Sequence, residues 1–196
     1  RGFGEMIQLV ADDPEKVRSY AASTVREADR LNQLANELLD YSRGEIRLEV
    51  GVVPLATLFN RVVESMHERL SARGATIDVQ NEVDEPVILD EERMLRVLVN
   101  LCDNARKAMS RGDSLVLRAA SDGSDLVLTV KDTGRGMEEA VVAHIFEPFY
   151  SSSPDGGTGL GMVIVKSVVE AHGGTITVDS EPGEGTTVTL RLPLRR

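Results

Sequence analysis

Three polar side chains stand at helical spacing in one short stretch of the chain. Asn100, Asn104 and Lys107 are four and three residues apart, so they share one face of a helix predicted over residues 91–109. Two amides and an ammonium group suit a magnesium ion that carries phosphates, because Mg²⁺ takes few protein oxygens and lysine offers phosphates a point charge. The alternative is a solvated helix face. Apolar residues predicted to be buried fill the rest of the helix: Leu98, Leu101, Cys102, Ala105 and Met109.

A carboxylate stands directly before a glycine-rich turn. Asp132 ends a strand predicted over residues 125–130 and precedes Thr133-Gly134-Arg135-Gly136. A fixed carboxylate can accept a hydrogen bond from the exocyclic amine of adenine, and Gly134 and Gly136 let the backbone lie close to a base. An ordinary turn after a strand has the same residue types. The residues alone leave both interpretations open.

A second glycine-rich segment, Gly157-Thr158-Gly159-Leu160-Gly161, leads into a helix predicted over residues 160–171. Such a turn presents unpaired N–H groups and the positive end of the helix dipole to an anion. It lacks the Gly-Lys-Ser/Thr ending of a P-loop. A fourth segment, Gly185-Thr186-Thr187, precedes the last predicted strand. Each pattern alone is weak, but together they predict a nucleotide-binding protein.

The elements that position these residues alternate between strand and helix from residue 46 onward. Ile46, Leu48 and Val50 alternate as a strand does, and Pro54 opens a helix that runs to about residue 72. Two strands flanking Ser121-Asp122-Gly123 predict a hairpin. The remaining predicted elements are strands at 77–79, 87–89, 175–179 and 187–192 and a short helix at 138–145. The mixture predicts an α+β fold, a sandwich in which helices cover one face of a mixed sheet.

Residues 1–44 predict a separate helix, turn and helix. Asp12-Asp13-Pro14 is typical of a helix start, and a narrow apolar stripe with a seven-residue repeat follows. The helix either packs on its own domain or pairs with a second copy in a four-helix bundle. We favour pairing, because the stripe has too few large residues to cover a domain core. Its members are Val17, Ala21, Thr24, Ala28, Leu31, Ala35 and Leu38.

The composition excludes several classes of protein. A formal charge of −10 over 196 residues disfavours nucleic acid as a partner. The single cysteine, Cys102, allows no intrachain disulfide and fits a reducing compartment. No apolar run reaches the roughly 18 residues that span a membrane. Because the chain begins at Arg1-Gly2-Phe3, we expect it to be part of a longer protein, attached to a membrane, if at all, through other segments.

These segments resemble the N, G1, G2 and G3 boxes of the sensor histidine kinases, within the GHKL superfamily. Phe146-Glu147-Pro148-Phe149-Tyr150 is similar to the F box of the same family. The resemblance runs from about residue 46 to the C-terminus, and residues 27–43 resemble the second helix of the family's dimerisation domain. It implies a Bergerat sandwich that binds Mg·ATP over residues 45–196, preceded over residues 1–44 by part of a dimerisation and phosphotransfer hairpin.

The resemblance also implies roles for individual residues. Asn104 is similar to the magnesium ligand, with Asn100 in support, and Asn100 and Lys107 would be the catalytic groups. Asp132 is similar to the acid that recognises adenine, aided by Thr186 through water. The expected nucleotide-contacting residues are Asn104, Lys107, Asp132, Gly134, Gly136, Gly157, Thr158, Gly159, Leu160, Gly161 and Thr186.

The sequence departs from the family pattern in two ways: it has no phosphoacceptor histidine at the expected place, and it has no basic residue in the segment before Gly161. The family carries a phosphoacceptor histidine on the first dimerisation helix, and the segment that would hold it is expected to be missing here. His67 and His144 are expected at the surface, and His172 in a packing or turn position. No Lys or Arg lies between Glu147 and Gly161, so Lys107 and Mg²⁺ would carry most of the work on the γ-phosphate.

The implied function is that of an ATP-dependent protein-histidine kinase, in the cytoplasmic portion of a bacterial sensor protein. It would transfer the γ-phosphoryl group to a histidine for relay to an aspartate of a response regulator, and it would form a homodimer through the helical stem. One alternative is an ATP hydrolase of the gyrase and chaperone type. That chemistry needs a carboxylate where Asn100 stands, and an amide cannot accept a proton. The other alternative is a non-catalytic dimerisation module switched by nucleotide.

Overall fold

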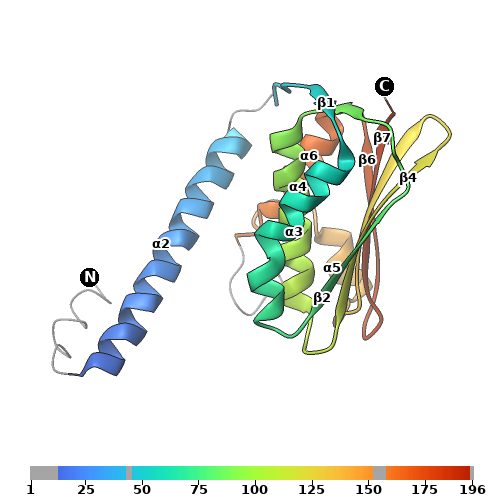
Figure 1. The fold of residues 1–196 in the computed structure, drawn as a ribbon. Coiled ribbons are helices and arrows are strands. Elements are labelled where there is room, and N and C mark those ends of the chain that lie inside the picture. The colour runs from blue at the N-terminus through green and yellow to red at the C-terminus, as the bar shows by residue number, and fades with distance from the viewer. Residues whose placement is uncertain (1–12, 43–45, 152–157, 195–196) are drawn as a thin grey trace. The chain divides into compact units, whose positions relative to one another are not determined.

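The computed structural model describes residues 13–42, 46–151 and 158–194. The chain divides into two compact units, residues 1–44 and 45–196, and each is described by itself. Helices and strands carry the labels of Figure 1. None of the helices in the described ranges is long and apolar enough to cross a membrane.

The first unit contains one long helix, α2 (Pro14–Ser42). Asp13 caps it: the Lys16 N–H donates to Asp13 Oδ1 at 3.2 Å, and the Lys16 ammonium lies 3.0 Å from Oδ2. These contacts with Lys16 lower the pKa of Asp13. Leu31, a member of the predicted apolar stripe, is largely exposed. The first helix of the predicted hairpin falls in residues 1–12, outside the described ranges, so pairing with a second copy stays a prediction.

The second unit is built on a five-stranded mixed sheet covered by helices on one face (Figure 1). The strand order is β2-β4-β5-β7-β6, with β2 and β4 parallel and every other pair antiparallel. The predicted α+β sandwich is confirmed. The strands are β2 (Thr76–Asn81), β4 (Ser114–Asp122), β5 (Asp125–Asp132), β6 (Thr175–Glu181) and β7 (Gly185–Pro193). The helices are α3 (Leu55–Ser71), α4 (Glu91–Ala108), α5 (Glu139–His144) and α6 (Gly161–Ala171).

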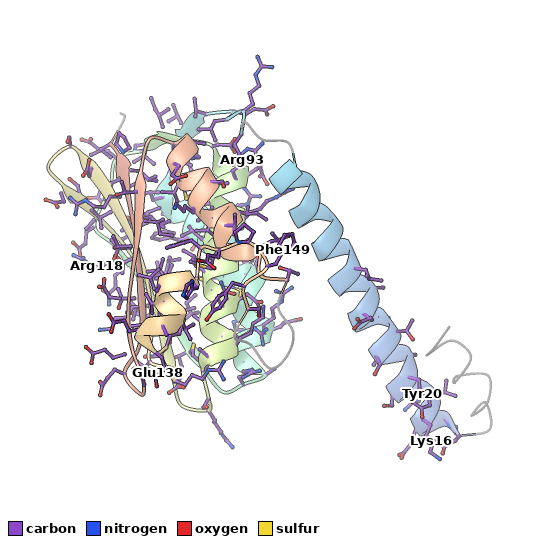
Figure 2. The ribbon with its side chains drawn as sticks, turned by 180° about the vertical axis from the view of Figure 1, so that it is seen from behind. Lys16, Tyr20, Arg93, Arg118, Glu138 and Phe149 are labelled. Carbon is purple, nitrogen blue, oxygen red and sulfur yellow. The ribbon has the colours of Figure 1, made fainter. Side chains whose placement is uncertain are left out.

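Alternating side chains divide the two faces of the sheet. Along β4, Leu115, Leu117 and Ala119 are fully buried, as expected for a strand with one covered face. Arg118 points to the opposite side, away from the helices (Figure 2), and its guanidinium holds both carboxylate oxygens of Glu82 at 2.8 Å. The hairpin predicted around residues 121–123 joins β4 to β5 and is confirmed.

A small second sheet corrects one prediction. Residues 46–50 form no strand; instead β1 (Gly51–Val53) pairs antiparallel with β3 (Val87–Leu89). The Glu49 N–H donates to Asp90 Oδ2 at 2.8 Å, so a side chain satisfies this backbone group in place of a neighbouring strand. Of the three alternating apolar residues, Ile46 packs against the core and Leu48 is half-buried, whereas Val50 is exposed. The alternation of apolar residues therefore reflects the partial burial of side chains and not the pairing of a strand.

Helix α4 carries the polar stripe and is the central helix of the layer. Asp90 caps its start, accepting the Arg93 N–H at 3.0 Å, while Arg106 and Lys107 complement the dipole in the last turn. All five residues predicted to be buried, Leu98, Leu101, Cys102, Ala105 and Met109, are buried. Burial raises the pKa of the Cys102 thiol to about 12, with Asp103 adding to the shift, so this thiol is inert in the folded protein.

Candidate nucleotide site

The polar stripe lies at the C-terminal half of α4. Asn100 is half-buried, Asn104 is exposed, and the Lys107 side chain is 34% exposed. All three therefore reach solvent from one side of a helix whose other side is in the core. This arrangement leaves two amides and one ammonium group accessible to a ligand.

The turn after β5 is packed on the end of α4. The Arg135 N–H donates to the Ala108 carbonyl at 3.1 Å, one residue beyond Lys107. Gly134 lies so close to the same carbonyl that a Cβ atom placed on it would stand 2.7 Å from Ala108 O. Only glycine allows this approach, which brings the residues after Asp132 beside the polar stripe.

The same turn interlocks with the β6–β7 turn. Gly136 has φ +63°, and a Cβ atom on it would lie 1.9 Å from Glu181 O. The Gly183 N–H donates to the Arg135 carbonyl at 2.8 Å. A Cβ atom on Gly185, where φ is +101°, would lie 2.1 Å from Asp132 O. The G1-like segment at 132–136 and the G3-like segment at 185–187, about 50 residues apart by numbering, therefore form one packed surface.

Thr186 stands opposite Asp132 in the β5–β7 ladder. Its hydroxyl is hydrogen-bonded to Ser180 Oγ at 2.9 Å, and Ser180 Oγ also accepts the Met137 N–H at 3.0 Å. Ser180 thus ties the threonine to the residue that follows Gly136. Ser180 carries no signal in the sequence, since a serine on an edge strand has no pattern that marks it.

Asp132 is the most unusual ionisable group of the site. It is only 4% exposed, and its Oδ1 accepts the Gly134 N–H at 2.9 Å. Burial raises its pKa, and the nearby charge of Asp113 adds to the rise, while the N–H groups of Gly134 and Thr186 oppose it. Within the described ranges no salt bridge involves Asp132. A buried carboxylate without a cation costs stability, and groups of this kind concentrate at functional sites.

The third glycine-rich segment enters α6, which packs on α4. Leu160 is fully buried, and its N–H donates to Thr158 Oγ1 at 3.2 Å. Gly161 is the first residue of α6, and a Cβ atom placed on it would meet nothing within 4 Å. Gly159 has φ +70° and accepts the Phe149 N–H at 3.1 Å. Gly157 lies outside the described residues.

The structure therefore brings most of the predicted site residues together. Direct contacts join the end of α4, the turn at 132–136 and the turn at 181–186. The segment at 158–161 is attached through the packing of α6 on α4. Sequence reasoning missed Asp103, whose carboxylate lies 2.9 Å from the Lys107 ammonium. The signal was available, because Asp103 and Lys107 stand at the i, i+4 spacing of helical ion pairs.

The three histidines lie where they were predicted. His67 is exposed, and His144 is exposed and contacts Glu147 at 2.8 Å. His172 is buried at the end of α6, where its Nε2 accepts the Asp90 N–H at 3.0 Å. Its Nδ1 lies 2.8 Å from the Val168 carbonyl and donates to it, which fixes the neutral tautomer.

The side chains of the site fit a magnesium ion whose other oxygen ligands come from phosphate and water. No cluster of three His, Cys, Asp or Glu side chains that could hold a metal ion occurs in the part of the chain that the structure describes. The accessible groups on α4 are instead the amides of Asn100 and Asn104. Mg²⁺ commonly uses few protein oxygens together with phosphate and water oxygens, so this site suits a metal that arrives with a nucleotide.

Comparison with known proteins decides the family. The model of the histidine kinase-, DNA gyrase B-, and HSP90-like ATPases matches residues 89–196, more than half of the chain. The chain belongs to this family. The matched region begins at the end of β3 and contains α4 and all the nucleotide-site segments named above.

Relatives within this family narrow the resemblance to sensor histidine kinases, as predicted. Sensor protein SrrB of Staphylococcus aureus is 31% identical over 98% of this chain, which spans 35% of that relative. The structure of full-length ShkA with AMPPNP is 30% identical, with a TM-score of 0.80, over 92% of this chain and 39% of ShkA. Histidine kinase ThkA, solved with response regulator TrrA, is 26% identical, with a TM-score of 0.78, over 98% of this chain and 56% of that chain. The chain thus spans about a third of the curated relatives that it matches.

Proposed function

We propose that this chain is the ATP-binding catalytic part of a sensor histidine kinase. It transfers the γ-phosphoryl group of ATP to a histidine on a dimerisation helix, and an aspartate of a receiver domain then takes the group. The single observation that carries the proposal is Asp132, a buried carboxylate without a cation between two interlocked glycine turns at the end of α4. That environment suits a neutral ligand edge that donates a hydrogen bond.

Adenine recognition rests on Asp132. One carboxylate oxygen holds the turn through the Gly134 N–H, which leaves the group oriented to accept from the exocyclic amine of adenine. Gly134 and Gly136 let the turn after Asp132 pack tightly against the end of α4 and against Glu181, which holds the carboxylate in place. Thr186, held by Ser180, supports the same edge through a water molecule.

Phosphate binding rests on α4 and α6. Lys107 supplies the positive charge, and the first turn of α6, which begins at Gly161, supplies a helix N-terminus for the phosphates. Asn104 holds Mg²⁺, with Asn100 in support. The metal, when bound with ATP, neutralises phosphate charge and holds the phosphate chain in one conformation.

Catalysis then consists of positioning and charge neutralisation, because phosphoryl transfer asks little covalent chemistry of the protein. A neutral imidazole nitrogen of the acceptor forms the new bond to the γ-phosphorus, and the bond to the β–γ bridging oxygen breaks to release ADP. Lys107 and Asn100 act on the phosphates during this step. The amide of Asn100 provides no general base, which disfavours the attack of water that an ATP hydrolase requires.

Two features support the partners and location that we propose. The exposed Leu31 and Val25 on α2 favour a homodimer through the helical unit. ThkA was solved with a response regulator, and the similarity of this chain to ThkA supports a receiver domain as the partner. We place the chain in the cytoplasmic portion of a bacterial sensor protein, where ATP is available.

A phosphotransfer assay tests the proposal. The chain is incubated with Mg²⁺ and ATP labelled at the γ-phosphate, together with a separate helical domain that carries the acceptor histidine. We expect label on the acceptor domain that is stable in base and lost in acid, as a phosphohistidine is. The Asp132→Asn variant, run in parallel, should transfer no label.

Each other result selects a different function. Free phosphate without label on the acceptor would indicate an ATP hydrolase. ATP binding without either product would indicate a nucleotide-switched dimerisation module. Absence of ATP binding by calorimetry would overturn the nucleotide site itself.

A further inference from the structure

A cluster of opposite charges centred on Asp103 adjoins the polar stripe of α4. The Asp103 side chain is 17% exposed, so most of it is removed from water. The Arg106 Nε lies 2.8 Å from Oδ1, and the Lys107 Nζ lies 2.9 Å from Oδ2. Arg69, in the last turn of α3, adds a guanidinium 3.7 Å from Oδ1. Asp103 therefore compensates the same ammonium group that we assign to the phosphates.

The two carboxylate oxygens have separate partners. Arg106 and Arg69 contact Oδ1, whereas Lys107 contacts Oδ2 alone. If Lys107 turns toward a phosphate, Oδ1 keeps its guanidinium partners and the carboxylate is not left without a cation.

Helical geometry places Lys107 between its two possible partners. At 100° per residue, Lys107 lies about 40° from Asp103 on one side and about 60° from Asn104 on the other. The Lys107 side chain is 34% exposed, so its ammonium group can change partner at the helix surface. The phosphates proposed beside Asn104 and the carboxylate of Asp103 then compete for one cation.

We propose that Asp103 is a positioning residue that holds the Lys107 ammonium on α4 until the nucleotide phosphates take it. This role rests on the proposed function and regulates the same site. Binding of the triphosphate then requires the Asp103–Lys107 ion pair to break. The affinity for the triphosphate is therefore lower than it would be if Lys107 had no carboxylate partner. Breaking this ion pair leaves the adenine contacts unaffected. Asp103 thus sets the affinity for phosphates and not for the base.

A double-mutant cycle tests the role. Dissociation constants for Mg·ATP and for adenosine are measured by calorimetry in the wild type, Asp103→Asn, Lys107→Met and the double variant. We expect Asp103→Asn to tighten Mg·ATP binding about threefold to tenfold, the range of one partly exposed ion pair. In the Lys107→Met background the same change should alter affinity less than about twofold. Adenosine should bind all four alike.

Two further variants separate this role from a general charge effect. Asp113→Asn removes an acid that acts on Asp132 electrostatically but has no contact with Lys107, so its effect should be the same in both backgrounds. Asp103→Glu retains the negative charge and the i, i+4 pairing with Lys107, so it should bind Mg·ATP with wild-type affinity. This variant therefore tests the role of the charge even if Asp103→Asn perturbs the fold.

The outcomes distinguish the two proposals. Three results would overturn the positioning role alone. The first is weaker Mg·ATP binding by Asp103→Asn. The others are a change in Mg·ATP affinity that is equal with Lys107 and with Met at position 107, or a change in adenosine affinity as large as that in Mg·ATP affinity. A wild type that binds adenosine and ATP to no measurable extent would overturn the proposed function and this role with it.

Discussion

Two buried aspartates at the ends of strands have opposite surroundings. Asp90 follows β3 and is 5% exposed; Asp132 ends β5 and is 4% exposed. Each accepts a hydrogen bond from the backbone two or three residues ahead. Residue type, burial and local turn chemistry are therefore nearly matched between them.

The difference lies in the remaining partners. Asp90 also accepts the Glu49 N–H at 2.8 Å, and the Arg93 guanidinium lies 3.5 Å from the same oxygen. For Asp132 the neighbouring charge is another acid, Asp113, and burial raises its pKa. The carboxylate with a cation caps a helix and anchors a connecting segment. The carboxylate without one is costly to the folded protein, which suits a group whose partner is a ligand.

The largest expected effect is on the affinity of Asp132→Asn for ATP. The amide can still accept the Gly134 N–H, but its NH₂ group would face the adenine amine, donor against donor. We expect ATP affinity to fall more than about 100-fold, because a site built for one hydrogen-bond pattern strongly rejects its reverse. Calorimetry of the variant with Mg·ATP measures this.

Thermal unfolding of the same variant provides the control. Removing an uncompensated buried charge should leave Tm equal to the wild-type value or above it. A variant that keeps its ATP affinity, or that unfolds many degrees lower, would contradict the assignment of Asp132 as a ligand-reading group.

A smaller effect, on stability alone, is expected of Asp90→Ala. The change removes the helix cap and leaves the Glu49 N–H without its acceptor, at a cost of about 1–3 kcal/mol. Urea unfolding followed by circular dichroism measures the loss. The affinity for ATP should change less than about threefold, since the cap is at the other end of α4 from Lys107. A large loss of affinity with unchanged stability would erase the contrast between the two aspartates.

The sequence predicted the layers and most elements because these depend on local signals. The helix start at Asp12-Asp13-Pro14, the turn at residues 121–123 and the apolar periodicities of helices and strands each depend on residues close together in the chain. The strand predicted at 46–50 was wrong for a non-local reason. Its backbone partner is the Asp90 side chain, 41 residues away, and no pattern near Glu49 announces that contact.

The residues of the candidate site also divide into those that local spacing predicts and those that depend on contacts distant in the sequence. Asn100, Asn104 and Lys107 follow from helical spacing alone. The interlocking of Gly136 with Glu181, and of Gly185 with Asp132, depends on the pairing of β5 with β7 and could be expected only through the family resemblance. The raised pKa of Asp132 could be expected from neither source, since it depends on the burial and on the neighbour Asp113 that only the folded chain supplies.

The smallest expected effect is a pH dependence that separates the wild type from Asp132→Asn. The pKa of Asp132 is raised in the folded protein, so its protonation stabilises the fold. That contribution is complete below the unfolded value of 3.8 and is lost as pH rises through the folded pKa. At pH 7 the wild type should therefore unfold about 1–3 °C below the variant, and the gap should close as pH falls toward about 4. Asp103, whose pKa is lowered, has the opposite sign but is present in both proteins and cancels in the difference. Paired thermal unfolding curves at several pH values measure the gap. A gap that widens toward acid would mean that Asp132 is stabilised as a carboxylate, as a helix cap is, and the contrast with Asp90 would fail.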